Sequence, residues 1–349
     1  MQLEELITSL SALPSVSGRE RDALPGLTAL IGPCFDEQYT DAAGNCVFVK
    51  RSGKPDARSI LIDTHLDEIG MMVTEVCDGG FLRVTNLGGL DARTLQASEV
   101  MILGKKTAYA VVAAKPPHLS TKEERAKLET VNELYIDTGY PKEQAEELFP
   151  VGTPVKYKPS YHKLLNGRIA GTSFDDKACG ACAAYALSDI PAEQLAGDVY
   201  LLFSQREESS RESFGAGTGA YGIDPDYAIA VDVDLGTAPD TPKYETIDVG
   251  KGISIAASVS MNRAYTKALM ALCGEKSIPY QPLAASLSTG TNGEGIRLTS
   301  AGIPTAVIGL PLQNMHTQNE IISMDDAETL VKFIRTFVSS EKLGEVFGR

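Results

Sequence analysis

The chain has 349 residues, of which 43% are hydrophobic, and a formal net charge of −14. Its length suits two domains better than one simple core. The acidic excess disfavours nucleic acid and anionic membrane surfaces as partners, because both attract lysine and arginine. No apolar run reaches the roughly 20 residues that span a bilayer, and the N-terminus lacks the basic and apolar regions of a signal peptide. We therefore expect a cytoplasmic protein.

Helix-like and strand-like segments alternate along the chain. The first is an amphipathic helix, in which Leu3, Leu6, Ile7 and Leu10 share one face. Strands are predicted at 44–50, 58–63, 198–204, 227–233 and 303–310, and further helices at 177–189, 263–274 and 325–340, the last with an S-x-x-D capping pattern at Ser323 and Asp326. The strands are near-continuous apolar runs, typical of strands covered on both faces. The pattern predicts an α/β three-layer sandwich with a mixed, largely parallel central sheet.

The segment 70–164 has a different texture. Short strand-like runs alternate with dense glycine and proline, and one helix-like piece follows Ser120. We predict a smaller β-rich inserted domain at 70–164, and a larger domain made of 1–69 and 165–349.

Acids and histidines gather where the apolar runs end. Five separate segments carry them: His65 and Asp67, Asp175 and Asp176, Glu207 and Glu208, Asp232 and Asp234, and His316. In a parallel sheet, strand ends at one edge converge on one crevice, where such folds bind ligands. We therefore expect these side chains to meet.

Taken singly, each of these groups has an ordinary explanation as a cap, a turn residue or a solvated pair. Taken together, clustered carboxylates would repel one another unless cations lay between them. Two histidines with three or four carboxylates suit a pair of zinc- or cobalt-class ions. The remaining histidines, His118 and His162, are interpreted as structural or surface residues.

Two other motifs invite a different function. Cys179 and Cys182 form a CxxC without a second pair, so they are better explained as small residues on one helix face than as a zinc or redox site. The glycines of FGAGTGAYG (214–222) do not turn directly from strand to helix, and no GKS or GKT follows them. They are expected to allow a close backbone approach rather than nucleotide binding.

The sequence resembles, nearly end to end, the M42 family of dinuclear metallo-aminopeptidases. This is the glutamyl and tetrahedral aminopeptidase group, some members of which carry the label endoglucanase. The motifs are LSALPSVSGRE, DAAGN, THLDEIGMMV, GGFLRVTNLGGLD, KPPHL, LYIDTGY, FDDK, the EE pair, AVDV with the following DTP, and IPTAVIGLP…H…E. HLDEIG and EE are fairly specific in combination.

The resemblance implies that five residues bind the metal ions. His65 and Asp232 would bind one ion, Glu208 and His316 would hold the second, and Asp175 would bridge both. It also implies that the inserted domain makes dimer contacts and that dimers assemble into larger shells, up to a dodecamer.

Two further residues would serve the chemistry. By the resemblance, Asp67 would orient the ring of His65, and Glu207 would be the general base for a water activated by the two metal ions. If the two glutamates alternate along an extended segment, they point in different directions, so that only one can face a given ion squarely. The chain departs from the family pattern after Glu208, at Asn292 and before His316, which bears on substrate choice.

The leading hypothesis is therefore a metal-dependent aminopeptidase acting on peptides. A co-catalytic metal deacylase or carboxypeptidase on the same scaffold is an alternative, and so is a non-catalytic assembly protein that retains the fold. Glycan hydrolysis is disfavoured, because paired carboxylates would suffice for it and the histidines would have no task.

Overall fold

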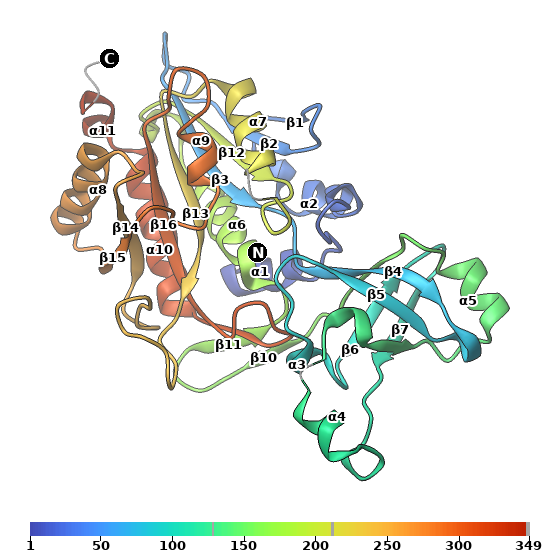
Figure 1. The fold of residues 1–349 in the computed structure, drawn as a ribbon. Helices are drawn as coiled ribbons and strands as arrows, with labels where there is room; N and C mark the ends of the chain where they lie inside the picture. Colours follow the sequence, from blue (N-terminus) through green and yellow to red (C-terminus); the bar gives the residue numbers. More distant parts are fainter. Residues whose placement is uncertain (128, 211–212, 347–349) are drawn as a thin grey trace.

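The computed structural model describes residues 1–127, 129–210 and 213–346. A large α/β body is joined to a smaller barrel that projects from one side of it (Figure 1). Among these residues, no helix has the length and apolarity needed to cross a bilayer. The cytoplasmic location stays a prediction from the sequence.

One mixed sheet forms the centre of the large body. Its four central strands run parallel in the order β12 (Asp198–Ser204), β3 (Ser59–His65), β13 (Tyr227–Leu235) and β16 (Thr305–Gln313). Antiparallel strands extend both sides: β2 (Cys46–Lys50) and β1 (Glu37–Thr40) beside β12, and β17 (Glu320–Ser323), β11 (Arg168–Gly171) and β10 (Tyr161–Lys163) beyond β16. Strands β14 (Ile253–Ser258) and β15 (Tyr280–Ala285) branch from β16.

Helices cover both faces of this sheet, as the three-layer prediction requires. One face packs on α1 (Leu3–Ser11), α2 (Leu24–Ile31), α6 (Phe174–Ser188), α8 (Arg263–Lys276) and α10 (Met324–Val338), with α11 (Glu341–Glu345) beside α8. The other face packs on α7 (Phe214–Ile223) and α9 (Gly293–Ile296). The apolar stripe predicted for the first helix is buried in the first of these cores. The α/β sandwich is confirmed, and its parallel part is the group of four central strands together with the β14–β15 pair.

A closed barrel forms the smaller body, with its own apolar core. Its strands are β4 (Gly70–Val76), β5 (Leu82–Leu87), β8 (Tyr135–Asp137), β7 (Thr107–Val112), β6 (Glu99–Leu103) and β9 (Pro154–Tyr157), and α3 (Ala92–Leu95), α4 (Lys122–Ala126) and α5 (Lys142–Leu148) connect them. Short 3₁₀ helices η1–η6 lie at Glu20–Asp22, Gly32–Cys34, Asp78–Gly80, Pro117–Leu119, Val131–Glu133 and Ala192–Gln194. The barrel strands lie within the predicted insert, whose bounds at 70 and 164 stay a prediction.

Ser323 is the N-cap residue of α10, as predicted for the start of this helix, but the capping bond that the pattern predicts for the serine side chain is not formed. The carboxylate of Asp326 instead accepts hydrogen bonds from the backbone N–H groups of Gly250 and Gly252. The loop that contains Gly250 and Gly252 is distant in sequence but lies against the start of the helix. Its N–H groups therefore bind the Asp326 carboxylate that the S-x-x-D pattern predicted to cap the helix.

Candidate active site

The carboxyl ends of the four parallel strands meet at one edge of the sheet. His65 is the last residue of β3 and lies opposite Ser204, the last residue of β12, and Asp232 lies on the neighbouring β13. The loop after β16 carries His316. A cavity of about 370 Å³ opens here, and its lining includes Asp175, Glu207, Glu208, Asp232 and His316. The fold therefore brings these segments together, as predicted.

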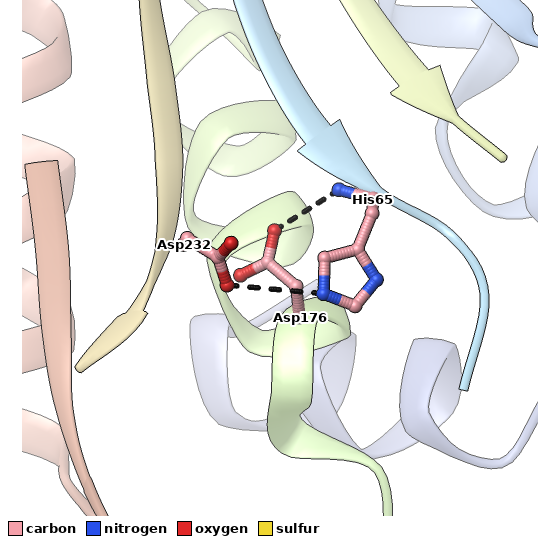
Figure 2. A group of neighbouring side chains, drawn as sticks. All are labelled: His65, Asp176 and Asp232. Atoms are coloured by element: carbon pink, nitrogen blue, oxygen red, sulfur yellow. Dashed lines mark hydrogen bonds and ion pairs between the residues drawn. The ribbon is translucent and has the colours of Figure 1, made fainter. Parts of the chain in front are cut away.

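The His65 ring is held in one orientation. Its Nδ1 lies 2.9 Å from the backbone oxygen of Asp67. A carbonyl oxygen only accepts hydrogen bonds, so in the neutral ring Nδ1 carries the proton and Nε2 is the nitrogen that can bind a cation. That Nε2 lies 3.0 Å from Asp175 Oδ1. It also lies 3.8 Å from Asp232 Oδ1 (Figure 2). Two carboxylates therefore face an imidazole nitrogen that is ready to bind a cation.

Asp175 faces both histidines. Its Oδ1 points to His65, while its Oδ2 lies 3.4 Å from Nε2 of His316. The same His316 nitrogen lies 3.2 Å from Glu208 Oε2. A barrel residue also reaches this ring: a Cβ added at Gly89 would lie 2.8 Å from His316 Nδ1. Only glycine allows the barrel loop to come this close to the imidazole.

Asp176 lies in the same cluster, although the resemblance assigned it no role. It is fully buried, and its Oδ2 accepts a hydrogen bond from the backbone N–H of His65 at 3.1 Å (Figure 2). Ligand atoms of His65, Asp176 and Asp232 lie within 4.8 Å of one another, as do those of His65, Asp175 and Glu208. The peptide bond between Asp175 and Asp176 is cis. The acidic doublet before the helix was the only sequence signal for Asp176.

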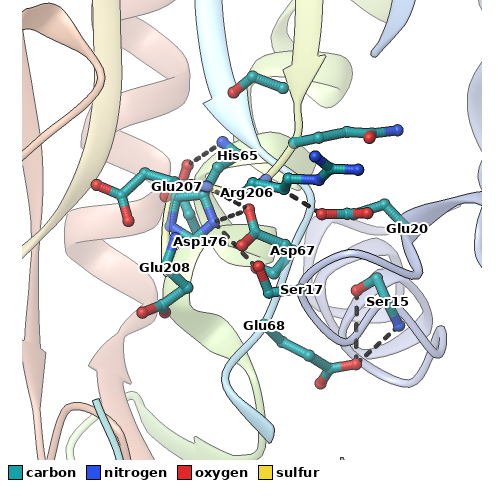
Figure 3. Close-up of polar contacts among 12 residues, drawn as sticks. Ser15, Ser17, Glu20, His65, Asp67, Glu68, Asp176, Arg206, Glu207 and Glu208 are labelled. Carbon is teal, nitrogen blue, oxygen red and sulfur yellow. Dashed lines mark hydrogen bonds and ion pairs between the residues drawn. The ribbon is translucent and has the colours of Figure 1, made fainter. Parts of the chain in front are cut away.

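Glu207 and Glu208 lie in a tight turn after β12, so the condition of an extended segment is not met. The carboxylate of Asp67 holds this turn: Oδ1 accepts from the Glu207 N–H at 2.9 Å and Oδ2 from the Glu208 N–H at 3.2 Å (Figure 3). The Asp67 carboxylate is farther from the His65 ring, at 3.5 Å, than the Asp67 carbonyl is. Asp67 thus contacts the ring through its backbone and the glutamates through its side chain.

The charges of this site suit a cation. Burial raises the pKa of Glu207 to about 8 and that of Glu208 above its usual range, and the neighbouring carboxylates add to both shifts. Burial also raises the pKa of Asp232. Burial opposes a charge on His65, yet the adjacent acids raise the pKa of its ring above the usual value. Imidazole nitrogens and carboxylate oxygens that attract positive charge so strongly are the donor set that divalent ions such as zinc bind.

Glu320 was missed as a site residue. It is buried, and its Oε2 accepts hydrogen bonds from the backbone N–H groups of Phe174, at 2.7 Å, and Asp175, at 3.1 Å. Its Oε1 accepts from the backbone N–H of His316 at 3.0 Å. One carboxylate thus holds the main chain of two metal-ligand candidates. Its place in the last quoted motif was the only sign of this in the sequence.

The other sequence candidates are not among the clustered ligand atoms. Cys179 and Cys182 are free thiols buried in α6, and His118 and His162 are exposed. Asp234 lines the cavity and accepts a hydrogen bond from the Ser254 hydroxyl.

The glycine-rich segment forms helix α7, not a phosphate-binding loop. A Cβ added at Gly215 would lie 2.2 Å from the backbone oxygen of Gln205. The predicted close approach is therefore made to the end of β12, next to the two glutamates.

Comparison with known proteins gives one consistent result. The family model described as M42 glutamyl aminopeptidase matches residues 44–333. A lysyl aminopeptidase of Pyrococcus furiosus is 28% identical over 347 residues, which cover 97% of each chain.

Solved structures agree with this result. The TET aminopeptidase of Thaumarchaeota archaeon SCGC AB-539-E09 superposes with a TM-score of 0.91 at 26% identity, over 99% of each chain. The TET1 peptidase of Pyrococcus horikoshii, described as assembling into a tetrahedron or a large octahedral shell, gives a TM-score of 0.84 at 25% identity, over 97% of this chain and 99% of its own.

Proposed function

The chain belongs to the M42 glutamyl aminopeptidase family, and we propose that it removes N-terminal residues from peptides with the help of two divalent metal ions of the zinc or cobalt class. The observation that carries this proposal is the position of Asp175, whose two oxygens face two different histidines. One carboxylate placed between two imidazoles suits a pair of cations that share a bridging ligand.

Five side chains would hold these ions. His65 and Asp232 would bind the first ion, Glu208 and His316 the second, and Asp175 both. Such ions, when bound, lower the pKa of water toward neutrality and polarise a carbonyl group. Asp67 and Glu320 would keep the ligands in place, because their carboxylates hold the backbone around Glu208, Asp175 and His316.

Glu207 would act as general base. It lines the cavity next to the ligand group, and burial raises its pKa to about 8. Nearby cations would lower this pKa again by favouring the carboxylate, which brings it toward the range for proton exchange at neutral pH. Glu207 would take a proton from the attacking water and deliver it to the leaving amine.

The cavity favours capture of a free amine. Among the described residues that line it, carboxylates are abundant and neither lysine nor arginine occurs. A carboxypeptidase or an N-acyl amino acid deacylase must bind a substrate carboxylate, for which a cationic side chain is the usual partner. The lining therefore supports an aminopeptidase over these alternatives. The intact ligand set argues against a non-catalytic assembly protein.

A substrate panel tests this function. The purified chain, reconstituted with zinc or cobalt, is incubated with aminoacyl anilides, with N-acetylated peptides and with N-acyl amino acids. We expect hydrolysis of anilides with a free amine, no hydrolysis after EDTA treatment and recovery when metal is restored. Equal turnover of acetylated and free N-termini would exclude the aminopeptidase assignment, and activity confined to N-acyl amino acids would favour the deacylase.

We further propose that the barrel domain mediates homo-oligomer formation. On β7, Tyr109 is 65% exposed and Val111 is 45% exposed, and both lie on the outward side of the strand. A relative described as forming shells supports an assembly of several subunits. Light scattering of the wild type and of Tyr109→Glu measures the subunit number. An unchanged assembly in the variant would contradict a contact through β7.

A further inference from the structure

Three successive backbone N–H groups, in the turn that carries Glu207 and Glu208, donate to two buried carboxylates. The N–H groups of Glu207 and Glu208 bond to Asp67, as described above. The preceding N–H, that of Arg206, bonds to Oε1 of Glu20 at 3.1 Å (Figure 3). Glu20 comes from the N-terminal segment, 186 positions away. Two acids from distant parts of the chain therefore share one turn.

Arg206 has an unfavourable backbone conformation. Its φ is +58°, in the left-handed region that residues with a Cβ rarely adopt. Such a conformation is unfavourable and persists only when the surroundings hold it. The hydrogen bond to Glu20 is made by the N–H of this residue, immediately before Glu207. Glu20 therefore acts at the point where the direction of the turn is set.

Glu20 is itself fixed in place. Its side chain is 1% exposed, and the same oxygen that binds Arg206 also accepts from the Gly18 N–H at 2.9 Å. Nearby, the hydroxyl of Ser17 lies 2.6 Å from that of Ser209, at the far end of the turn. The Ser17 N–H donates to the backbone oxygen of Glu68, which anchors the segment beside β3. Residues 17–20 thus pack against the turn that carries Glu207 and Glu208.

We propose that Glu20 is a positioning residue for Glu207. By holding Arg206 in its left-handed conformation, Glu20 fixes the direction in which the next side chain enters the cavity. This inference rests on the proposed function, in which Glu207 is the general base. Glu20 does not line the cavity, so it acts through the turn and not through substrate.

The two hydrogen bonds make a sharp distinction between variants. Both end on one oxygen of Glu20, and the amide oxygen of glutamine can accept both. Glu20→Gln therefore keeps an acceptor for both N–H groups while it replaces the other carboxylate oxygen by an NH2 group, whereas Glu20→Ala removes the acceptor. Glu193, exposed in η6, offers a matched Glu→Ala control remote from the turn.

The experiment compares these variants on an aminoacyl anilide that the wild type cleaves. A displaced reacting group costs up to about a hundredfold in rate. We expect Glu20→Ala to lower kcat about ten- to a hundredfold, with KM and metal content unchanged. Glu20→Gln and Glu193→Ala are expected to keep the wild-type kcat. A wild-type kcat in Glu20→Ala, or an equal loss in Glu20→Gln, would overturn the proposal.

Two further measurements keep the test decisive. If Glu20→Ala does not fold, Glu20→Asp replaces it, because the shorter side chain withdraws the acceptor from Arg206; full activity in that variant refutes the proposal. Hydrogen exchange of a peptide covering 198–210 reports on the turn without any activity. Exchange should be faster in Glu20→Ala, or in Glu20→Asp if that variant replaces it, than in Glu20→Gln. Equal rates would show that Glu20 does not hold the turn. An inactive wild type would reject the aminopeptidase function. The exchange comparison would still test whether Glu20 holds the turn in place.

Discussion

Replacing Glu68 with glutamine is expected to destabilise the fold strongly, because Glu68 forms ion pairs with two buried lysines. The Nζ of Lys156, in barrel strand β9, lies 2.6 Å from Glu68 Oε1, and that of Lys177, in α6, lies 3.2 Å from it. All three side chains are at most 2% exposed. The cluster joins the barrel to the larger body at the point where the chain leaves β3.

The magnitude follows from what remains after the substitution. A glutamine can still accept from the Ser15 N–H, which lies 2.9 Å from Glu68 Oε1, so the main loss is the negative charge. The Nζ atoms of both lysines then have in common the backbone oxygen of Leu13, at 3.1 Å from Lys156 and 2.7 Å from Lys177. Burial lowers the pKa of Lys177 to about 7, so this lysine can release its proton when Glu68 is lost. Removing one partner of a buried ion pair typically costs about 3–5 kcal/mol, because the other charge is left uncompensated. We expect Glu68→Gln to lose an amount in this range.

Urea unfolding followed by circular dichroism measures the loss. The control is Glu341→Gln, which breaks the Lys54–Glu341 pair. Its charged atoms lie 2.8 Å apart, and its side chains are 36% and 74% exposed. Exposed pairs contribute little, so this variant should unfold like the wild type. If Glu68→Gln loses no more stability than the control, the buried charges do not depend on Glu68 and the reasoning fails.

The remaining predictions concern the same centre and its pH dependence. Glu207→Gln should keep its metal, because it removes the base and not a ligand, and should lose about 10²–10⁴ in kcat; full activity would contradict the base assignment. His65→Ala and Asp175→Ala should lose bound metal by elemental analysis, and an unchanged metal content would reject them as ligands. Although burial opposes ionisation of Glu68, the two adjacent lysines lower its pKa to about 2, against about 4.3 in an unfolded chain. The stability it provides should be complete above about pH 4.3 and disappear as the pH falls toward 2, so the difference between wild type and Glu68→Gln should shrink in that window; a constant difference would contradict the assigned pKa.

Periodicity and strand ends were enough to predict much of this protein. The stripe of Leu3, Leu6, Ile7 and Leu10 predicted a buried helix face, and near-continuous apolar runs predicted strands covered on both sides. Because parallel strands end at a common edge, acids placed after those runs had to converge. For this reason a metal centre could be predicted from the sequence alone.

The supporting carboxylates could not be predicted in the same way. Glu20, Asp67 and Glu320 each bind backbone N–H groups of a segment that lies elsewhere in the chain, and Asp67 and Glu207 are 140 positions apart. A hydrogen bond of this kind depends on where two loops come to lie, which neither residue type nor spacing encodes. The turn at Glu207 is held by hydrogen bonds of this kind.

The sequence by itself determined which chemical groups this chain possesses and to which edge of the sheet they are carried, because hydrophobic periodicity sets the strands and the strands carry the groups. The tertiary structure alone decided how those groups face one another. Both oxygens of Asp175 point to imidazoles, and the glutamate turn is held by two distant acids, because packing of the loops fixes backbone direction to within a fraction of a side-chain length.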